Sequence, residues 1–374
     1  MPFDKPPKIL HLATHFNVGG ISSYISIVGS AMTARGYDIA ALSSGGNLEP
    51  ELIERNIRLY RLPIRAKSEL DPKLFFALPT LIRIVKRERF DLLHAHTRVT
   101  QVMAAVVSRL TGVPYVTTAH GYYKPRFGRR LFGCWGKRVI AISPLVAEEL
   151  EKSHRVPKDK IRVVYNAVDV DDLRRRLRGQ NPDALKKELG IDERSFVIGS
   201  VSRLVRDKGH EYLIGAVAQL RKKHGEAALV IVGDGREKKR LEHLIRKEGL
   251  GRHAFFVPPK PDITGMLSLM DAFVHPATFR EGFGLAMLEA MVAKIPVVAT
   301  DIWAINSIIR NRVNGFLVRP KSAQGIAAAL SFIIENPESA VAVAQNAYDM
   351  AVRSYSVDRL VNEMETVYQE VLSE

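Results

Sequence analysis

Short, apolar, β-branched runs alternate with longer stretches of helical periodicity along the chain. In the first half, the predicted strands are 8–14, 38–43, 57–62, 92–95, 115–119, 139–142 and 163–165. Between them, apolar residues recur at helical spacing, as in 21–34. Strands that alternate with helices are typical of parallel sheets covered on both faces.

The pattern is interrupted at 169–195, which is dense in charge and carries Gly179, Pro182 and Gly190. A second series follows, with predicted strands 196–200, 228–232, 254–257, 272–275, 296–299 and 315–318. The last predicted helix covers 357–372 after Ser356, a residue type favoured at helix N-caps. We therefore expect an α/β chain of two doubly wound, Rossmann-like domains. Because open parallel sheets bind ligands outside the carboxyl ends of their strands, the domains are expected to face each other across a cleft.

Length and composition narrow the class of protein. A chain of 374 residues with 46% hydrophobic content can bury two cores. Its longest apolar runs fall short of the roughly 20 residues that span a bilayer, and the polar, proline-rich start lacks a secretory signal, so we expect a cytoplasmic protein. The single cysteine, Cys134, excludes an internal disulfide and a cysteine-cluster metal site.

The net charge of +15 is concentrated in the first half. Residues 1–168 hold 26 lysines and arginines against 13 acidic residues, whereas 169–374 hold 29 against 27. No acidic residue lies between Asp91 and Glu148, where basic side chains are interleaved with aromatic ones such as Tyr122, Tyr123 and Trp135. This pattern suits an anionic surface, such as lipid headgroups, a phosphorylated glycolipid or nucleic acid, and an ordinary solvated basic face accounts for it equally well.

Gly19 and Gly20 lie between the first predicted strand and the first predicted helix. Paired glycines let the backbone approach a phosphate, and the following helix offers unpaired N–H groups. A purely structural turn uses glycine as readily. The dinucleotide fingerprint GxGxxG is absent, and no acidic residue ends the next strand, so a NAD-dependent dehydrogenase is disfavoured.

Two cations follow the first strand of the second series. Arg203 and Lys208 occupy the loop at its carboxyl end, where they could clamp a diphosphate leaving group. Either one alone would commonly be an exposed surface residue. Their shared loop favours the functional interpretation.

The segment from Glu281 to Glu289 holds the strongest signal. Gly282 and Gly284 predict a turn, and an apolar helix begins near Leu285. Glu289 lies among apolar residues in that helix, where a carboxylate is costly unless it is paired. Ligand hydroxyls would satisfy it, and so would a neighbouring backbone group or arginine.

Together these segments resemble the family 4 glycosyltransferases, also called group 1, which have the GT-B fold. The resemblance rests on four motifs in order: Gly19-Gly20, Ser202-Arg203-Leu204-x3-Lys208-Gly209, Val232-Gly233-Asp234-Gly235 and Glu281-x7-Glu289. It implies an acceptor domain, 1–168, followed by a donor domain, 169–354, with 355–374 packing back on the first. It also implies transfer with retention at the anomeric carbon, and no metal or other cofactor.

The resemblance also implies roles for individual residues. Arg203 and Lys208 would hold the donor diphosphate, Glu281 the hydroxyls of the sugar, and Glu289 the ribose. The expected donor-binding set is Gly19, Gly20, Arg203, Lys208, Glu281, Gly282, Phe283, Gly284, Leu285 and Glu289.

His120 matches the family position close to the transferred sugar, which makes His120, Glu281, Arg203 and Lys208 the expected catalytic residues; a structural role for His120 stays open. His94 and His96 are expected on the acceptor side. Two histidines without a third ligand do not predict a metal site.

One segment departs from the family pattern. Trp303 and Ser307 stand where the family commonly has a glycine and a glutamate, near the donor phosphates and sugar. Because of this departure, the sequence does not identify the transferred sugar.

The sequence thus predicts a retaining hexosyltransferase (EC 2.4) that uses a nucleotide-diphosphate sugar and a glycan or lipid-linked, lipopolysaccharide-type acceptor. Docking on an anionic membrane surface through the basic first domain is a further expectation, and no nucleic acid is expected as a partner. A nucleotide-sugar epimerase of similar fold and a basic nucleic-acid-binding protein are the alternatives.

Overall fold

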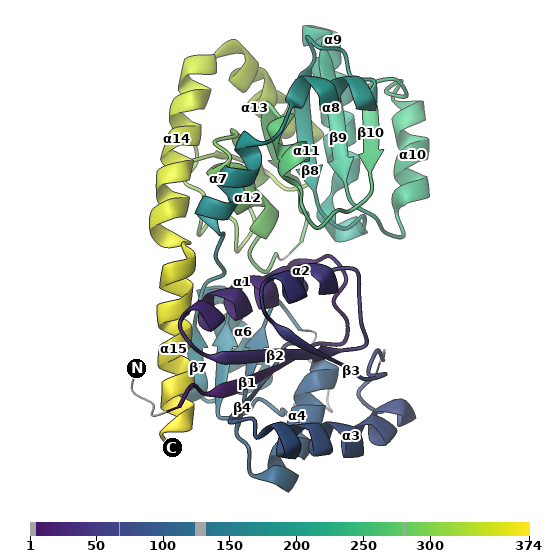
Figure 1. The fold of residues 1–374 in the computed structure, drawn as a ribbon. Coiled ribbons are helices and arrows are strands. Elements are labelled where there is room, and N and C mark those ends of the chain that lie inside the picture. Colours follow the sequence, from purple (N-terminus) through teal and green to yellow (C-terminus); the bar gives the residue numbers. More distant parts are fainter. Residues whose placement is uncertain (1–4, 67, 124–131, 280) are drawn as a thin grey trace. The chain divides into compact units, whose positions relative to one another are not determined.

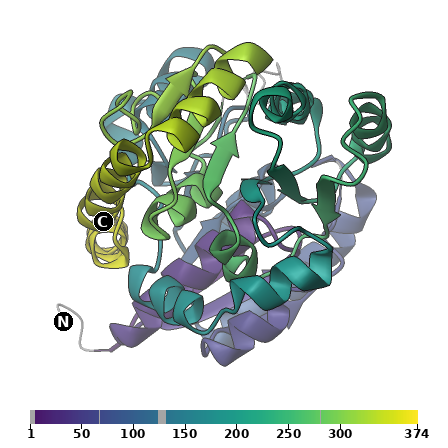
Figure 2. The ribbon, with the colours of Figure 1, turned by 90° about the horizontal axis from the view of Figure 1, so that it is seen from above.

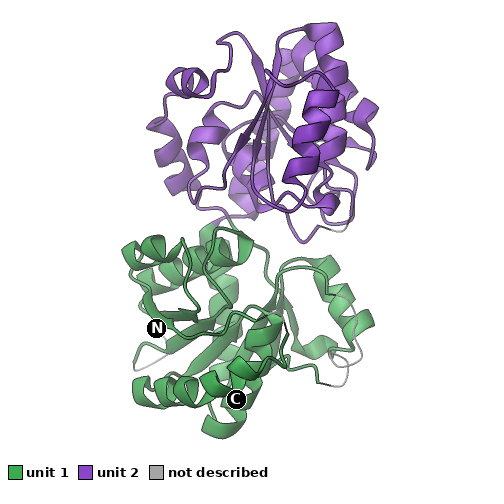
Figure 3. Ribbon diagram, turned by 90° about the vertical axis from the view of Figure 1, so that its right-hand side faces the viewer, with its two compact units in different colours: residues 1–167, 357–374 green, residues 168–356 purple. Residues whose placement is uncertain are grey.

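The computed structural model describes residues 5–66, 68–123, 132–279 and 281–374. The chain divides into two compact units: unit 1 comprises residues 1–167 and 357–374, and unit 2 comprises residues 168–356 (Figure 3). The boundaries expected from the sequence, after 168 and after 354, lie one and two residues away from these. The C-terminal segment therefore belongs to unit 1.

Unit 1 is built on a seven-stranded parallel sheet with the strand order β3-β2-β1-β4-β5-β6-β7. Its strands are β1 (Lys8–Leu12), β2 (Asp38–Ser43), β3 (Arg58–Arg61), β4 (Leu92–Ala95), β5 (Tyr115–Ala119), β6 (Arg138–Ala141) and β7 (Ile161–Val163). The order reverses between β1 and β4, which is the switch point where doubly wound sheets bind ligands.

Helices cover both faces of this sheet (Figure 1). The described helices of unit 1 are α1 (Gly20–Ala34), α2 (Glu49–Glu54), α3 (Pro72–Glu88), α4 (Arg98–Thr111), α6 (Pro144–His154), the short 3-10 helix η1 (Lys158–Lys160) and α15 (Val357–Leu372). Side chains of α1 and α15 pack with Ile9 and Ile39, whereas those of α3 and α4 pack with Leu10 and Leu42. Alternate residues of each strand therefore face two separate cores.

Unit 2 repeats the architecture with the order β10-β9-β8-β11-β12-β13. Its strands are β8 (Phe196–Val201), β9 (Ala227–Val232), β10 (Ala254–Val257), β11 (Ala272–His275), β12 (Val297–Thr300) and β13 (Phe316–Val318). Its helices are α7 (Val170–Arg178), α8 (Pro182–Leu189), η2 (Arg206–Lys208), α9 (His210–His224), α10 (Lys238–Lys247), α11 (Thr264–Ser268), α12 (Leu285–Val292), α13 (Ala323–Glu335) and α14 (Pro337–Ser354). In Figure 2 these helices flank the sheet on both sides, with α9 and α13 packed together over one core.

Two sequence predictions need correction. The strand expected at 163–165 is instead Ile161–Val163, although the N–H of Val164 still donates to the carbonyl of Ala141 at 3.0 Å. The interruption at 169–195 contains two helices, α7 and α8, capped by the side chains of Asp169 and Asn181. The sequence does not predict these helices, because few of their residues are buried and they therefore lack a clear apolar periodicity.

No single described helix has the length and hydropathy needed to cross a membrane. Helices α13 and α14 meet that test only together, and they are bent by 107° at the break between them.

Candidate active site

The loops after β8 and β11 lie against each other at the switch point of unit 2. Gly209 ends the β8 loop in a left-handed conformation, with φ 66°, and a Cβ atom there would lie 2.0 Å from the carbonyl oxygen of Pro276. The N–H of Thr278 donates to the carbonyl of Asp207 at 2.8 Å. Only glycine permits this close approach, so Gly209 fixes the position of the adjacent Lys208.

Lys208 and Glu281, both predicted site residues, form an ion pair between Nζ and Oε2. The same Oε2 atom lies 3.1 Å from Nε2 of His275, a buried residue that ends β11. Burial alone would raise the pKa of Glu281, but the hydrogen bond to His275 and the charge of Lys208 hold it below its usual range. Glu281 is therefore a half-buried carboxylate that stays ionised.

Arg203 lies in the same loop, and its side chain is exposed. Within the described ranges, its guanidinium group makes no hydrogen bond or ion pair. The loop that carries it packs closely on the turn after β9, because a Cβ atom at Gly233 would lie 2.0 Å from the carbonyl oxygen of Ser202. The backbone of Arg203 is thus held, while its guanidinium group is available to a ligand.

The segment after Glu281 leads into α12. The N–H of Gly282 lies 3.2 Å from Oε1 of Glu281, and Gly284, with φ 87°, is the N-cap of α12 without a side-chain cap. Phe283 is 3% exposed, and its ring centroid lies 5.4 Å from that of Tyr355. The side chain of Phe283 is thus a core group, so only its backbone could serve a ligand. Leu285 begins α12, and Glu289 lies half-buried within it.

The remaining predicted residues lie in unit 1. Gly19 and Gly20 are exposed at the start of α1, which has no side-chain N-cap. A Cβ atom at Gly20 would meet nothing within 4 Å. The first N–H groups of α1 are therefore accessible, which suits an anionic group.

His94, His96 and His120 form one connected group in unit 1, joined by His11 of β1. Nδ1 of His11 lies 2.9 Å from Nε2 of His96, and Nδ1 of His96 lies 3.0 Å from Nε2 of His120. His94 lies beside them and bonds Tyr368 of α15 and Thr118 of β5, both at 2.7 Å. Alternation along β1, β4 and β5 turns all four rings toward the face covered by α1 and α15.

Burial keeps these histidines neutral. His11, His94 and His96 have no exposed surface, and His120 is half-buried. Burial lowers the pKa of His11 and of His120 to about 3, and it lowers the pKa values of His94 and His96 well below their usual range. All four rings therefore carry one proton each at neutral pH.

The third histidine that the sequence reasoning lacked is present. His11, His94 and His96 bring ligand nitrogens within 4.8 Å of one another. In this arrangement, however, both nitrogens of His94 and both of His96 are engaged in hydrogen bonds. A metal ion would have to displace those bonds.

Two family descriptions match the chain. "Glycosyltransferase Family 4" matches residues 18–172, and "Glycosyl transferases group 1" matches residues 181–350. Together the two matches take in most of both units, in the order that the motifs predicted. The chain is a family 4 (group 1) glycosyltransferase.

Curated relatives and solved structures agree with this family. The glycosyltransferase is 24% identical to N-acetyl-alpha-D-glucosaminyl L-malate synthase of Bacillus anthracis over 95% of both chains. It is also 24% identical to the UDP-Gal:alpha-D-GlcNAc-diphosphoundecaprenol alpha-1,3-galactosyltransferase of Escherichia coli, over 89% of both. The Anabaena protein HepE, solved with UDP and glucose, superposes with a TM-score of 0.84 at 24% identity, covering 97% of this chain and 99% of HepE. The fold is the two-domain GT-B fold.

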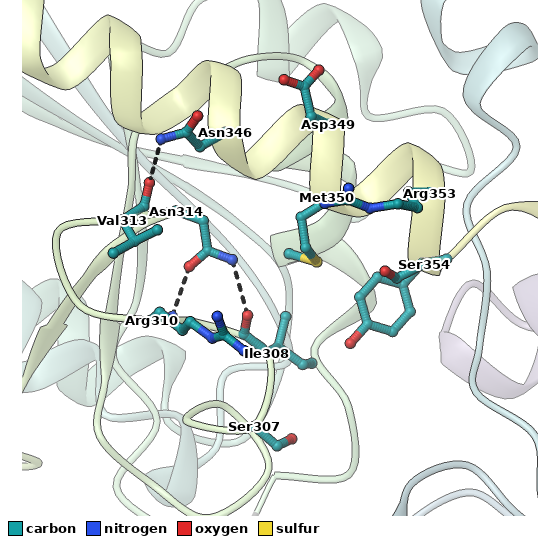
Figure 4. Close-up of a pocket in the computed structure, with 11 residues that line it drawn as sticks. Ser307, Ile308, Arg310, Val313, Asn314, Asn346, Asp349, Met350, Arg353 and Ser354 are labelled. Atoms are coloured by element: carbon teal, nitrogen blue, oxygen red, sulfur yellow. Dashed lines mark hydrogen bonds between the residues drawn. The ribbon is translucent and has the colours of Figure 1, made fainter.

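The residues that depart from the family pattern lie after β12. Trp303 is 40% exposed, and the hydroxyl of Ser307 donates to the carbonyl of Ala304 at 2.8 Å. Ser307 also borders a pocket of about 580 Å³ against the end of α14 (Figure 4). Asn314 and Asn346 brace that pocket through bonds to backbone groups of Arg310, Ile308 and Val313. The pocket lining includes neither Lys208 nor Glu281, so it is not the site described above.

Sequence reasoning missed His275 and His11 in this glycosyltransferase. His11 lies inside a predicted strand, and His275 is the last residue of another. A polar residue within a buried strand needs a partner, and that requirement was the available signal.

Proposed function

We propose that this glycosyltransferase moves a hexose from a nucleotide-diphosphate sugar onto a glycan or lipid-linked acceptor, with retention and without a metal ion. The observation that carries the proposal is the Lys208–Glu281–His275 group, together with the exposed Arg203 in the loop that carries Lys208. The names of two relatives support the donor class, because one uses UDP-galactose and the other is solved with UDP and glucose.

The cations would stabilise the departing diphosphate. Cleavage of the sugar–phosphate bond places negative charge on the leaving group. An ammonium group has three N–H donors, so Lys208 can hold Glu281 with one and a phosphate with another. Arg203 adds a planar guanidinium group suited to phosphate, and the uncapped start of α12 adds N–H groups.

Glu281 would bind the hydroxyls of the sugar rather than attack the anomeric carbon. Its carboxylate is shared between Lys208 and His275, and this pairing lowers its reactivity as a nucleophile. Same-face attack assisted by the leaving phosphate is then the mechanism we favour. Glu289, within α12, would bind the ribose, and His120 would contact the transferred sugar.

The donor proposal is tested by ligand-induced stabilisation. UDP-, GDP-, ADP- and dTDP-sugars would be screened by thermal unfolding, where a ligand at 100 times its dissociation constant adds roughly 2.7 kcal/mol. Transfer would then be measured with each stabilising donor. No stabilisation by any nucleotide sugar would contradict the proposal, and donor conversion without an acceptor would indicate an epimerase.

Arg203 offers a matched comparison within one loop. Arg203→Ala should reduce transfer about 10²-fold or more, because a donor aimed at the leaving group is lost. Arg206, also exposed in this loop and not part of the proposed site, supplies the control variant Arg206→Ala. Equal activities of the two variants would remove Arg203 from the site.

For the acceptor, we propose a lipid-linked molecule reached from an anionic membrane surface, on the cytoplasmic face. Unit 1 exposes several large apolar side chains, among them Leu70 (75%), Phe75 (61%), Phe76 (83%) and Phe132 (70%). Arg98 bonds both Glu69, at 3.2 Å, and the carbonyl of Phe132, at 2.7 Å, so Leu70 and Phe132 lie near each other.

Basic residues accompany this apolar surface. Lys73, Arg83 and Lys86 are exposed on α3, the helix that carries Phe75 and Phe76. Apolar side chains flanked by cations suit the headgroup region of an anionic bilayer. Part of the aromatic and basic stretch noted in the sequence, Lys124, Arg126, Phe127, Arg129 and Arg130, lies outside the described residues.

Vesicle flotation tests the membrane proposal. The protein should float with phosphatidylcholine vesicles that contain phosphatidylglycerol and not with phosphatidylcholine alone. Phe75→Ser combined with Phe76→Ser should abolish flotation, whereas Val341→Ser, an exposed apolar position of unit 2, should not. Equal binding to both vesicle types, or none, would reject this proposal, and salt-sensitive RNA binding instead would favour a nucleic-acid partner.

A further inference from the structure

Three histidines of unit 1 form a hydrogen-bonded chain from the interior to a partly exposed position. His11 lies at the buried end, His120 is half-buried at the other end, and His96 bonds both of them, at 2.9 and 3.0 Å. His96 therefore uses both of its ring nitrogens within the chain.

A neutral imidazole has one N–H group and one unprotonated nitrogen. The burial of all three rings, which lowers their pKa values, keeps them neutral. His96 must then donate one of its two bonds and accept the other. The nitrogen of His96 that carries the proton therefore determines which nitrogens of His11 and His120 are protonated.

Only two arrangements satisfy both bonds. In the first, His11 Nδ1–H donates to His96 Nε2, and His96 Nδ1–H donates to His120 Nε2, so the proton of His120 lies on Nδ1. In the second, both bonds are reversed, which places an N–H group at Nε2 of His11 and leaves Nδ1 of His120 unprotonated. The two arrangements differ at the two ends of the chain.

The ends decide between them. Nε2 of His11 is buried and has no hydrogen-bond partner. Buried N–H groups without a partner are rarer in proteins than buried acceptors without one, so the first arrangement is favoured. At the other end, Nδ1 of His120 bonds no atom of the described residues, and a ligand or water can meet it.

We propose that His96 is a positioning residue that fixes His120 in the tautomer protonated at Nδ1. His120 then offers an N–H donor to an oxygen of the bound substrate and cannot act there as a general base. The substrate part of this inference rests on the proposed function, whereas the proton positions belong to the protein alone.

Packing restricts movement of the chain. The ring planes of His11 and His96 are nearly parallel, 10° apart, with centroids 5.2 Å apart. The ring of Tyr24 on α1 meets both His96 and His120 edge-on, with centroids 5.7 and 4.9 Å apart. These contacts hold the nitrogens in line, so a ring flip would break both bonds.

Nitrogen-15 NMR of the full chain, labelled at histidine, tests the tautomer directly. Ring chemical shifts distinguish protonated from unprotonated nitrogens, and single histidine substitutions assign them. We expect a protonated Nδ1 and an unprotonated Nε2 on His120, and the same on His96. A protonated Nε2 on His120 would overturn the inference.

His96→Leu tests the positioning role by kinetics and NMR. It should lower the Nδ1-protonated share of His120 and reduce kcat about 10-fold or more. In a His120→Ala background, the same substitution should have little further effect. An equal loss of kcat in both backgrounds would show a structural role and overturn the proposal.

Three further variants keep the test informative. Val107→Ala, a buried core change in unit 1, controls for lost stability and should leave the tautomer of His120 unchanged. If His96→Leu does not fold, His11 provides the substitute. His11→Asn retains an amide donor near Nδ1 and should preserve the tautomer, whereas His11→Leu should shift it. Identical spectra for the two would overturn the proposal.

Failure of this inference and failure of the proposed function are distinguishable. A protein without transferase activity but with a protonated Nδ1 on His120 would refute the proposed function alone. An active enzyme with the opposite tautomer would refute this inference alone.

Discussion

The switch points of the two sheets hold side chains in different charge states: neutral in unit 1 and ionised in unit 2. In unit 1, between β1 and β4, buried histidines bond one another as neutral groups. In unit 2, between β8 and β11, a carboxylate stays ionised because Lys208 and His275 contact it. The same topology thus holds either kind of group. The difference shows that burial without an opposite charge keeps the histidines neutral, whereas the charge of Lys208 keeps the half-buried Glu281 ionised.

The largest expected effect is the removal of the positive charge in unit 2. Lys208→Met keeps most of the side-chain stem but leaves Glu281 with His275 alone. Transfer should fall about 10² to 10³-fold, because a donor to the leaving group is lost. Initial rates at saturating donor concentration measure this. A loss below about 10-fold would mean that Lys208 only balances Glu281.

Mild acid should destabilise the neutral histidines of unit 1 and leave the ion pair of Lys208 and Glu281 in unit 2 unchanged. The unfolded chain takes up protons on histidine near pH 6.5, whereas His11 and His120 resist protonation until about pH 3. The contribution of these two neutral histidines to the free energy of unfolding is therefore complete above pH 6.5, and it decreases as the pH falls toward 3. Each of the two histidines should cost about 1.4 kcal/mol per pH unit in that window.

Urea unfolding at pH 7.5, 6.5 and 5.5 measures this dependence. The lowered pKa of Glu281 makes its contribution fade only below the ordinary range of a glutamate, so this contribution stays constant over these pH values. His11→Asn should flatten the slope. An unfolding free energy that does not change between pH 6.5 and 5.5 would mean that the histidines are not buried as neutral groups.

A smaller effect on stability should follow from removing the hydroxyl group of Tyr368, which bonds His94. Tyr368→Phe removes the partner of Nδ1 of His94 and leaves that atom buried without a bond. The free energy of unfolding should fall by about 1–3 kcal/mol. Tyr212→Phe is the control, because its hydroxyl makes no bond within the described part of the chain. Equal urea midpoints for the two variants would contradict the role of Tyr368.

The smallest effect concerns an ion pair outside both sites. Lys223 and Glu335 contact each other on the surface of unit 2, with most of the lysine side chain exposed. Lys223→Met should leave the urea midpoint and the transfer rate unchanged, because solvent screens an exposed pair. A clear loss of stability or of transfer would mean that the exposed pair matters as much as the pair of Lys208 and Glu281, and it would contradict the comparison.

Much of the fold could be predicted because buried strands are short, continuous apolar runs. The strands Asp38–Ser43, Leu92–Ala95 and Tyr115–Ala119 and the helix Val357–Leu372 have the predicted bounds. The strand expected at 163–165 was displaced because Val164 is buried whether or not it lies in the strand. Apolar patterning reports burial, so it defines strand ends poorly.

The candidate site could be predicted only in part. Loop position and motif predict both Lys208 and Glu281 as site residues with separate roles, but they do not predict the contact between them. The family resemblance places Phe283 among the donor-binding residues, and only the structure shows that its side chain packs on Tyr355. Sequence identifies residue types in a loop, whereas the direction of a side chain depends on neighbours distant in the chain.

By itself, the sequence determined the two α/β units, the family, and the loops that carry the charged residues, because each is encoded in local patterns. Only the tertiary structure decided which groups are partners. His11 meets His96, 85 positions later in the chain, because β1 and β4 are neighbours in the sheet, and Lys208 meets Glu281 because the β8 and β11 loops touch at Gly209. Proton positions and charge states follow from those contacts, since each depends on distances of a few ångströms that strand order sets.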